Sequence, residues 1–150
     1  MSCKISLTTM DEFEIFKWRL LRDLCFEDCE GMWEPLWALR GCYAIDGQSE
    51  DERQAFAERA MRSLYCDGLI YFFRVGSFGN INEAADNPNA RLDDGQVEAQ
   101  LRSDWWRTPL GSSLPADHPN IWIAATPEGE TAADSPSDDI RHVLPSGGNH

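Results

Sequence analysis

Positive charge is scarce in this chain of 150 residues, which contains only two lysines, Lys4 and Lys17. Its 13 Lys and Arg residues stand against 26 Asp and Glu residues, so the net charge at pH 7 is −13. Proteins that bind nucleic acids draw much of their affinity from Lys and Arg side chains that contact phosphates. The composition therefore disfavours nucleic-acid binding unless the arginines gather on one face. The acidic excess either provides solubility alone or indicates a basic protein as the partner.

Long apolar runs and regularly spaced cysteines are also lacking. No apolar stretch approaches the roughly 18 residues that cross a bilayer, and the N-terminal segment MSCKISLTTMDEFE has no apolar core of a secretory signal. We therefore expect a cytoplasmic protein, either bacterial or, as a phage product, in the cytoplasm of a host cell. The five cysteines are irregularly spaced, which in that compartment indicates buried thiols rather than disulfides.

Patterns for catalysis and metal binding are missing. Cys25 and Cys29 are four residues apart on an expected helix, but zinc needs two further ligands, and the three histidines fall in expected loops or in the tail. The segment Gly76–Gly79 lacks the spacing of a phosphate-binding loop. We therefore expect no enzyme activity, no cofactor and no metal site.

Hydrophobic periodicity predicts three helices in the first half of the chain. They are expected at residues 8–27, 33–40 and 49–67. Ser49 and Glu52 have the spacing of a capping box at the start of the third helix, and Gly68 supplies the left-handed residue that ends it.

Two apolar strands are predicted, at residues 69–75 and 121–125. Between them, the periodicity of residues 92–106 favours a further helix. The flanking segments 76–91 and 108–120 are rich in Gly, Asn and Pro, as expected of loops.

The order of these segments resembles that of the winged helix-turn-helix domain of bacterial regulators. In many of these, a Gly-Leu-Ile or Gly-Leu-Val strand follows the third helix, matched here by Gly68-Leu69-Ile70. The returning strand ends in a Thr-Pro-Glu-Gly-like turn, matched by Thr126-Pro127-Glu128-Gly129. The resemblance covers roughly residues 10–130. It implies an α+β, winged-helix-like fold with three N-terminal helices and a two-stranded wing.

The resemblance also sets the expected domain organisation. A single winged-helix-like domain covers residues 1–130, and its wing is interrupted by a helical insertion at about residues 76–120. From Glu130 the chain is rich in small and acidic residues, Pro and Gly, so we expect a flexible acidic tail over residues 131–150.

The third helix enters the major groove in DNA-binding members of the family, but its first turn is strongly acidic here. We therefore predict a non-enzymatic protein–protein interaction module whose acidic surface binds a basic protein, as in immunity proteins, antitoxins and phage-encoded inhibitors. Trp and Arg are enriched at binding hot spots, which adds a Trp-Arg pair to the acidic residues. The candidate partner-binding residues are Glu50, Asp51, Glu52, Glu58, Trp106 and Arg107. The competing interpretation is that Trp105 packs into the core and Trp106 covers a loop.

Two alternatives remain open. A DNA-binding transcriptional regulator would use the helix at residues 49–67 together with the wing. Its DNA-binding residues would be Arg53, Arg59, Arg62 and Arg74, which would have to share one face. A DNA-mimicking inhibitor would instead carry carboxylates spaced like phosphates along one face.

Overall fold

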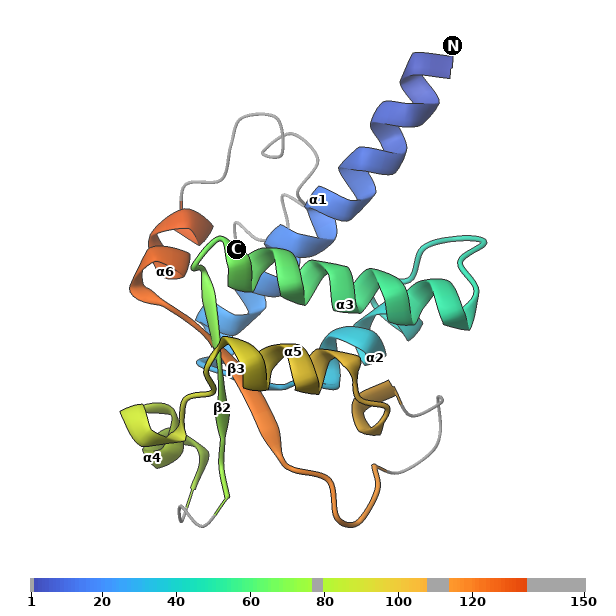
Figure 1. Ribbon diagram of the computed structural model, residues 1–150. Coiled ribbons are helices and arrows are strands. Elements are labelled where there is room, and N and C mark those ends of the chain that lie inside the picture. Colours follow the sequence, from blue (N-terminus) through green and yellow to red (C-terminus); the bar gives the residue numbers. More distant parts are fainter. Residues whose placement is uncertain (1, 77–79, 108–113, 135–150) are drawn as a thin grey trace.

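The computed structural model describes residues 2–76, 80–107 and 114–134, which form a mixed α+β fold (Figure 1). Within these residues, six α-helices accompany a three-stranded antiparallel sheet. The elements follow in the order α1 (Ser2–Glu27), β1 (Glu30–Gly31), α2 (Glu34–Arg40), α3 (Glu50–Cys66), β2 (Ile70–Arg74), α4 (Ile81–Ala85), η1 (Pro88–Ala90), α5 (Asp94–Arg102), η2 (Trp105–Arg107), β3 (Ile121–Ala125) and α6 (Pro127–Asp134).

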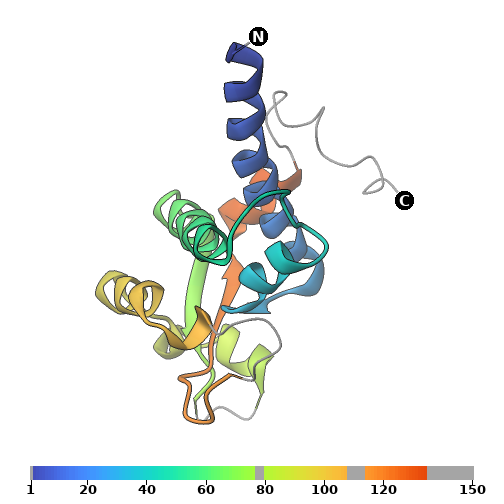
Figure 2. The ribbon, with the colours of Figure 1, turned by 90° about the vertical axis from the view of Figure 1, so that its right-hand side faces the viewer.

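The three predicted N-terminal helices are confirmed, with one change at the start of α1. That helix begins at Ser2 rather than at residue 8, and its first turns project away from the rest of the protein (Figures 1 and 2). The capping box of α3 is also confirmed. The Glu52 carboxylate accepts a hydrogen bond of 2.7 Å from the Ser49 amide, and the Ser49 hydroxyl accepts one of 3.2 Å from the Glu52 amide.

The sheet has the strand order β1-β3-β2, and all its pairings are antiparallel. β2 and β3 pair along their whole length, with Phe72 opposite Ile123, as expected for the two predicted strands. β1 was not predicted, because two residues are too few to show an alternating pattern. It pairs with β3 through Glu30 opposite Ile123, and this pairing carries Glu30 to the edge of the core.

Both faces of the β2–β3 pair are covered, and Figure 1 shows the sheet nearly edge-on between its helices. On one face, Phe72 and Ile123 join the main core, to which α1, α2, α3 and α5 also contribute. The opposite face carries a smaller cluster with α4 and η1, made of Phe73, Val75, Ala84, Ala90 and Ala124. Burial on both faces explains why the strands read as near-continuous apolar runs.

The expectation of a loop over residues 76–91 is wrong, and the first residues of the expected tail are helical. Residues 76–91 contain α4 and η1, because Asn80 and Asn87 each accept a hydrogen bond from a backbone amide and so cap these short helices. The expected tail is helical as far as Asp134, since the Thr126 side chain accepts a hydrogen bond from the Gly129 amide and starts α6. Residues 135–150 of that tail lie outside the described residues. The expected helix at 92–106 ends at Arg102 and is followed by η2.

Gly129 allows α6 to lie directly against α1 and the backbone of Leu69, which leads into β2. A Cβ atom at this position would lie 2.0 Å from the Leu69 carbonyl oxygen and 3.3 Å from Leu21 Cδ1. We expect Gly129→Ala to lower the free energy of unfolding by about 1–3 kcal/mol, because the backbone must move to admit the methyl group. Gly95→Ala in α5 is the matched control, since its Cβ would meet only Asp93 Oδ1, at 3.5 Å. Urea denaturation of both variants tests this; equal losses would contradict it.

Candidate functional site

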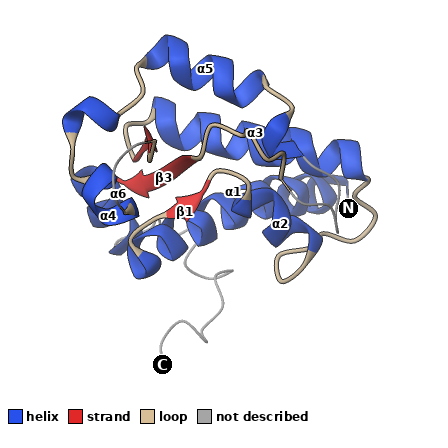
Figure 3. Ribbon diagram, turned by 90° about the horizontal axis from the view of Figure 1, so that it is seen from below, coloured by secondary structure: helices blue, strands red, loops and turns tan. Residues whose placement is uncertain are grey.

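The insertion between β2 and β3 packs along one side of α3, the helix expected to carry the binding residues. Arg62 of α3 donates two hydrogen bonds to Glu98 of α5, with Nη2–Oε1 at 2.7 Å and Nε–Oε2 at 3.3 Å. Tyr65 Oη donates to Asp94 at the start of α5. Figures 1 and 3 both show α5 running alongside α3. This side of α3 is therefore covered within the fold.

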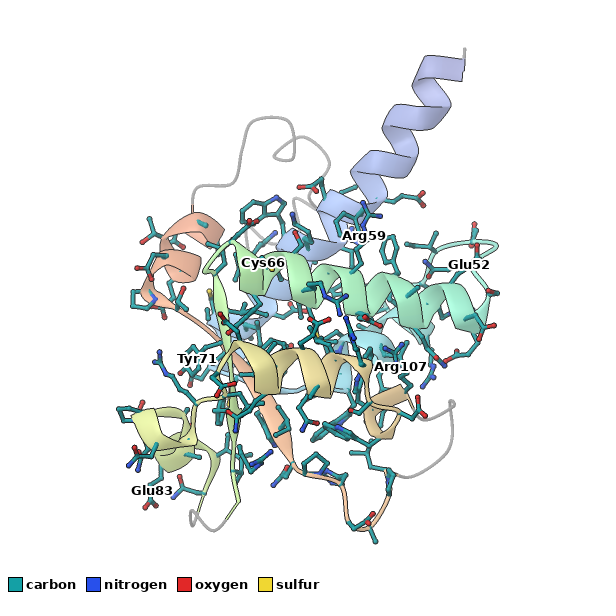
Figure 4. All side chains as sticks on the ribbon, in the orientation of Figure 1. Glu52, Arg59, Cys66, Tyr71, Glu83 and Arg107 are labelled. Carbon is teal, nitrogen blue, oxygen red and sulfur yellow. The ribbon has the colours of Figure 1, made fainter. Side chains whose placement is uncertain are left out.

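Arg107, at the end of η2, joins the later part of the insertion to α3. Figure 4 shows Arg107 beside that helix. Its guanidinium pairs with Glu58 and donates to the Leu101 carbonyl at 2.7 Å. Burial acts to raise the pKa of Glu58, but the hydrogen bonds from Arg107 and then Arg62 outweigh it and hold that pKa below its usual range. Glu58 therefore stays ionised, and its negative charge is balanced by Arg107 and Arg62 of the same chain.

The predicted partner-binding residues fall into two groups. Glu58, Trp106 and Arg107 come together at the contact between α3 and η2, where Trp106 is 0% exposed. Trp106 is therefore a core residue rather than a surface anchor, and the half-buried Trp105 is the one that lies nearer the surface. The second group lies at the start of α3 (Figure 4) and consists of Glu50, Asp51 and Glu52.

Within that second group, Glu50 already has partners in the fold. It pairs with Arg40 of α2, and this hydrogen bond is the main reason that the pKa of Glu50 is lowered. Arg53 lies 3.4 Å from the same carboxylate. Asp51 and Glu52 are exposed, so they are the members of this group that a partner can reach most easily.

The four arginines of the DNA-binding alternative are directed to different elements. Arg62 pairs with Glu58 and Glu98, whereas the Arg59 guanidinium lies 4.0 Å from the centre of the Phe13 ring of α1. Arg53 contacts Glu50, and Arg74 lies at the end of β2, outside α3. Arg59 and Arg62 are three residues apart on α3, but their contacts direct Arg59 to α1 and Arg62 to α5.

A pocket that the sequence analysis missed lies between the end of α1, β1 and α2. Its volume is about 290 Å³. Four carboxylates line it, and we call them the acidic pocket residues: Asp23, Glu27, Glu30 and Glu34. The signal was present, because the chain between residues 23 and 34 holds five acidic residues and no Lys or Arg. Asp28 ends α1 with a φ of 73°, and the turn it makes places these residues around one cavity.

Two of the acidic pocket residues are held by hydrogen bonds. Tyr43 Oη donates to Asp23 Oδ2 at 2.7 Å, and the Gly31 amide donates to Glu34 Oε2 at 2.6 Å. Burial is nevertheless the main influence on both carboxyl groups, and it raises the pKa of Asp23 and of Glu34. A cation in the pocket would therefore stabilise the ionised form of both side chains.

Glu30 is the most unusual of the four, because it is only 7% exposed. Burial, followed by repulsion from Glu34, Asp23 and Glu27, raises the pKa of Glu30 to about 8. Among the described residues, no Lys or Arg forms an ion pair with any acidic pocket residue. The charges of Arg22 and Arg19 on α1 lower the pKa of Asp23, but burial and the other influences leave it raised.

A larger pocket of about 570 Å³ lies between α3 and α5, but its polar groups are already satisfied. Arg62 pairs there with Glu98, and Tyr65 with Asp94. Burial and the hydrogen bond to Asp94 raise the pKa of Tyr65 to about 12, so it remains a neutral donor. The acidic pocket differs from this one, because its carboxylates have no Lys or Arg ion pair within the described part of the chain.

Comparison with known protein families, curated proteins and solved structures gives no match. Within residues 2–76, 80–107 and 114–134, no group of His, Cys, Asp or Glu side chains is arranged to hold a metal ion. Over the same part of the chain, no helix is long and apolar enough to cross a membrane. The geometry and charge of the described residues are thus the basis for a functional proposal.

Proposed function

We propose that this protein is a non-enzymatic interaction module on a winged-helix-like scaffold, and that its acidic surface binds a basic protein. Support for the scaffold comes from the order of elements. Three helices lead through Gly68 into β2, and β3 returns beside β2 to reach Thr126 and α6. The helix expected to read DNA in such a scaffold is α3.

The observation that carries the proposal is the uneven pairing of charge. Arg62 and Arg107 are bound by carboxylates of α3 and α5, so they offer little positive charge to phosphates. The acidic pocket residues, in contrast, repel one another without a Lys or Arg partner among the described residues. A cationic partner relieves that repulsion, and complementary charge speeds its association.

DNA binding through α3 has weaker support. The side of α3 that carries Arg62 is covered by α5, and groove entry on that side would require the insertion to move away. The exposed start of the helix carries Asp51 and Glu52, which repel phosphates.

Affinity capture with the tagged full chain tests the proposal. We expect a basic protein to be captured from a lysate of the source organism at low salt, and to be released as the salt concentration rises, because exposed charges are screened. Eluates are divided between mass spectrometry and nucleic-acid sequencing. Enrichment of duplex DNA with a shared sequence, without such a protein, would contradict the proposal.

A further inference from the structure

The acidic pocket has the size and lining for a single long side chain. Its volume of about 290 Å³ is just below the range of roughly 300–1,000 Å³ typical of sites for drug-sized ligands. Phe16 and Leu20 line it together with the carboxylates, and Trp37, 42% exposed, lies at its edge. Apolar and aromatic groups beside carboxylates suit a side chain with an aliphatic stem and a cationic head.

Glu30 points to the charge of the occupant. It lines the pocket, is 7% exposed, and has the Glu27 carboxyl group as its side-chain hydrogen-bond neighbour. Two carboxyl groups in contact need either a proton or a cation between them. Among the described residues, neither side chain has an ion pair with Lys or Arg, so the neutralising charge has to come from solvent or from a partner.

Arginine fits this arrangement better than lysine. Its planar guanidinium has five N–H donors, binds carboxylates in pairs and stacks on aromatic rings. The pocket offers Glu27 and Glu30 as adjacent acceptors, and Trp37 as an aromatic neighbour. A lysine ammonium is a compact point charge and would use fewer of these groups.

We propose that the acidic pocket binds one arginine side chain of a protein partner, against the adjacent carboxylates of Glu27 and Glu30 and beside the ring of Trp37. This inference rests on the proposed function and deepens it, because it names the part of the partner that is recognised. The partner is then a protein that presents an exposed arginine within a basic surface.

The probe is the peptide N-acetyl-glycyl-arginyl-glycine amide, titrated into the full-chain protein and followed by NMR chemical shifts. We expect millimolar affinity, with the largest shifts at the Glu30 and Gly31 amides and the Trp37 indole. The same peptide with citrulline in place of arginine keeps the shape without the charge and should not bind. Absence of binding by the arginine peptide, or equal binding by both peptides, would overturn the inference.

A pair of double variants, each of which replaces two glutamates by glutamine, completes the test. Glu27→Gln with Glu30→Gln is expected to weaken binding of the arginine peptide roughly fivefold or more, because it removes the two acceptors. Glu83→Gln with Glu128→Gln changes two exposed carboxylates on α4 and α6 and should leave affinity unchanged. Equal weakening by both would show a general charge effect and reject the pocket. If the peptide fails but affinity capture still yields a basic protein, the pocket inference fails and the proposed function stands.

Discussion

Replacement of Trp106 by alanine is expected to lower the free energy of unfolding by about 3–5 kcal/mol. This indole is 0% exposed and belongs to the main core. Its N–H donates to the Gln100 carbonyl at 2.9 Å, and the Arg107 guanidinium lies 4.4 Å from the ring centre. Removing it leaves a large cavity and loosens the contact between the insertion and α3.

Urea denaturation followed by circular dichroism measures this loss, and Trp105→Ala is the matched control. Trp105 is half-buried, donates to Gln100 Oε1 at 2.8 Å and stacks on His118 with ring centres 5.3 Å apart. We expect its replacement to cost about 1–2 kcal/mol, because less apolar surface is lost. A larger loss for Trp105→Ala than for Trp106→Ala would contradict the assignment of Trp106 to the core.

Glu30→Gln is expected to stabilise the protein at pH 8 by about 2–4 kcal/mol and to have little effect at pH 5. The pKa of Glu30 is raised from its ordinary value of 4.5 to about 8, so between these values the folded protein holds a proton that the unfolded chain has lost. The contribution to stability is therefore complete below about pH 4.5 and disappears as the pH rises to about 8. Glutamine stays neutral and avoids this loss.

Thermal unfolding of the wild type and the variant at pH 5 and pH 8 checks the prediction. The neighbours that face Glu30 are Asp23 and Glu27 from α1 and Glu34 from α2, and they are unchanged in the variant. Glu83→Gln, at an exposed position on α4, is the control. Its difference in stability from the wild type should be the same at both pH values. An equal difference between Glu30→Gln and the wild type at both pH values would show that Glu30 is not protonated in the folded protein.

Local signals in the sequence were sufficient to predict α2, α3, β2 and β3. The capping box at Ser49 and Glu52, and the glycine stop at Gly68, fix the ends of α3 by short-range hydrogen bonds. β1 was missed because it exists only through its pairing with β3. α6 also depends on a contact between distant segments. Thr126, at its start, donates a hydrogen bond of 2.7 Å to the Gly68 carbonyl. Contacts between distant segments leave no periodic pattern.

The site was harder to predict than the fold. The acidic residues of α3 were recognised, but the sequence could not show that Glu58 is paired with Arg107, which is 49 positions away. The roles of Trp105 and Trp106 were reversed because adjacent residues in a short turn follow no helical period. The acidic pocket required the turn at Asp28, whose positive φ brings Glu30 and Glu34 back towards the end of α1.

The central claim is that the acidic pocket, and not the arginines of α3, recognises the partner. Affinity capture in parallel by the wild type, the Glu27→Gln, Glu30→Gln double variant and Arg59→Gln tests it most directly. Arg59 is exposed on α3, so its replacement leaves the pocket intact. We predict that a basic protein is captured by the wild type and by Arg59→Gln and is lost from the double variant. Capture of DNA, or of a partner that is lost from Arg59→Gln and kept by the double variant, would contradict the claim.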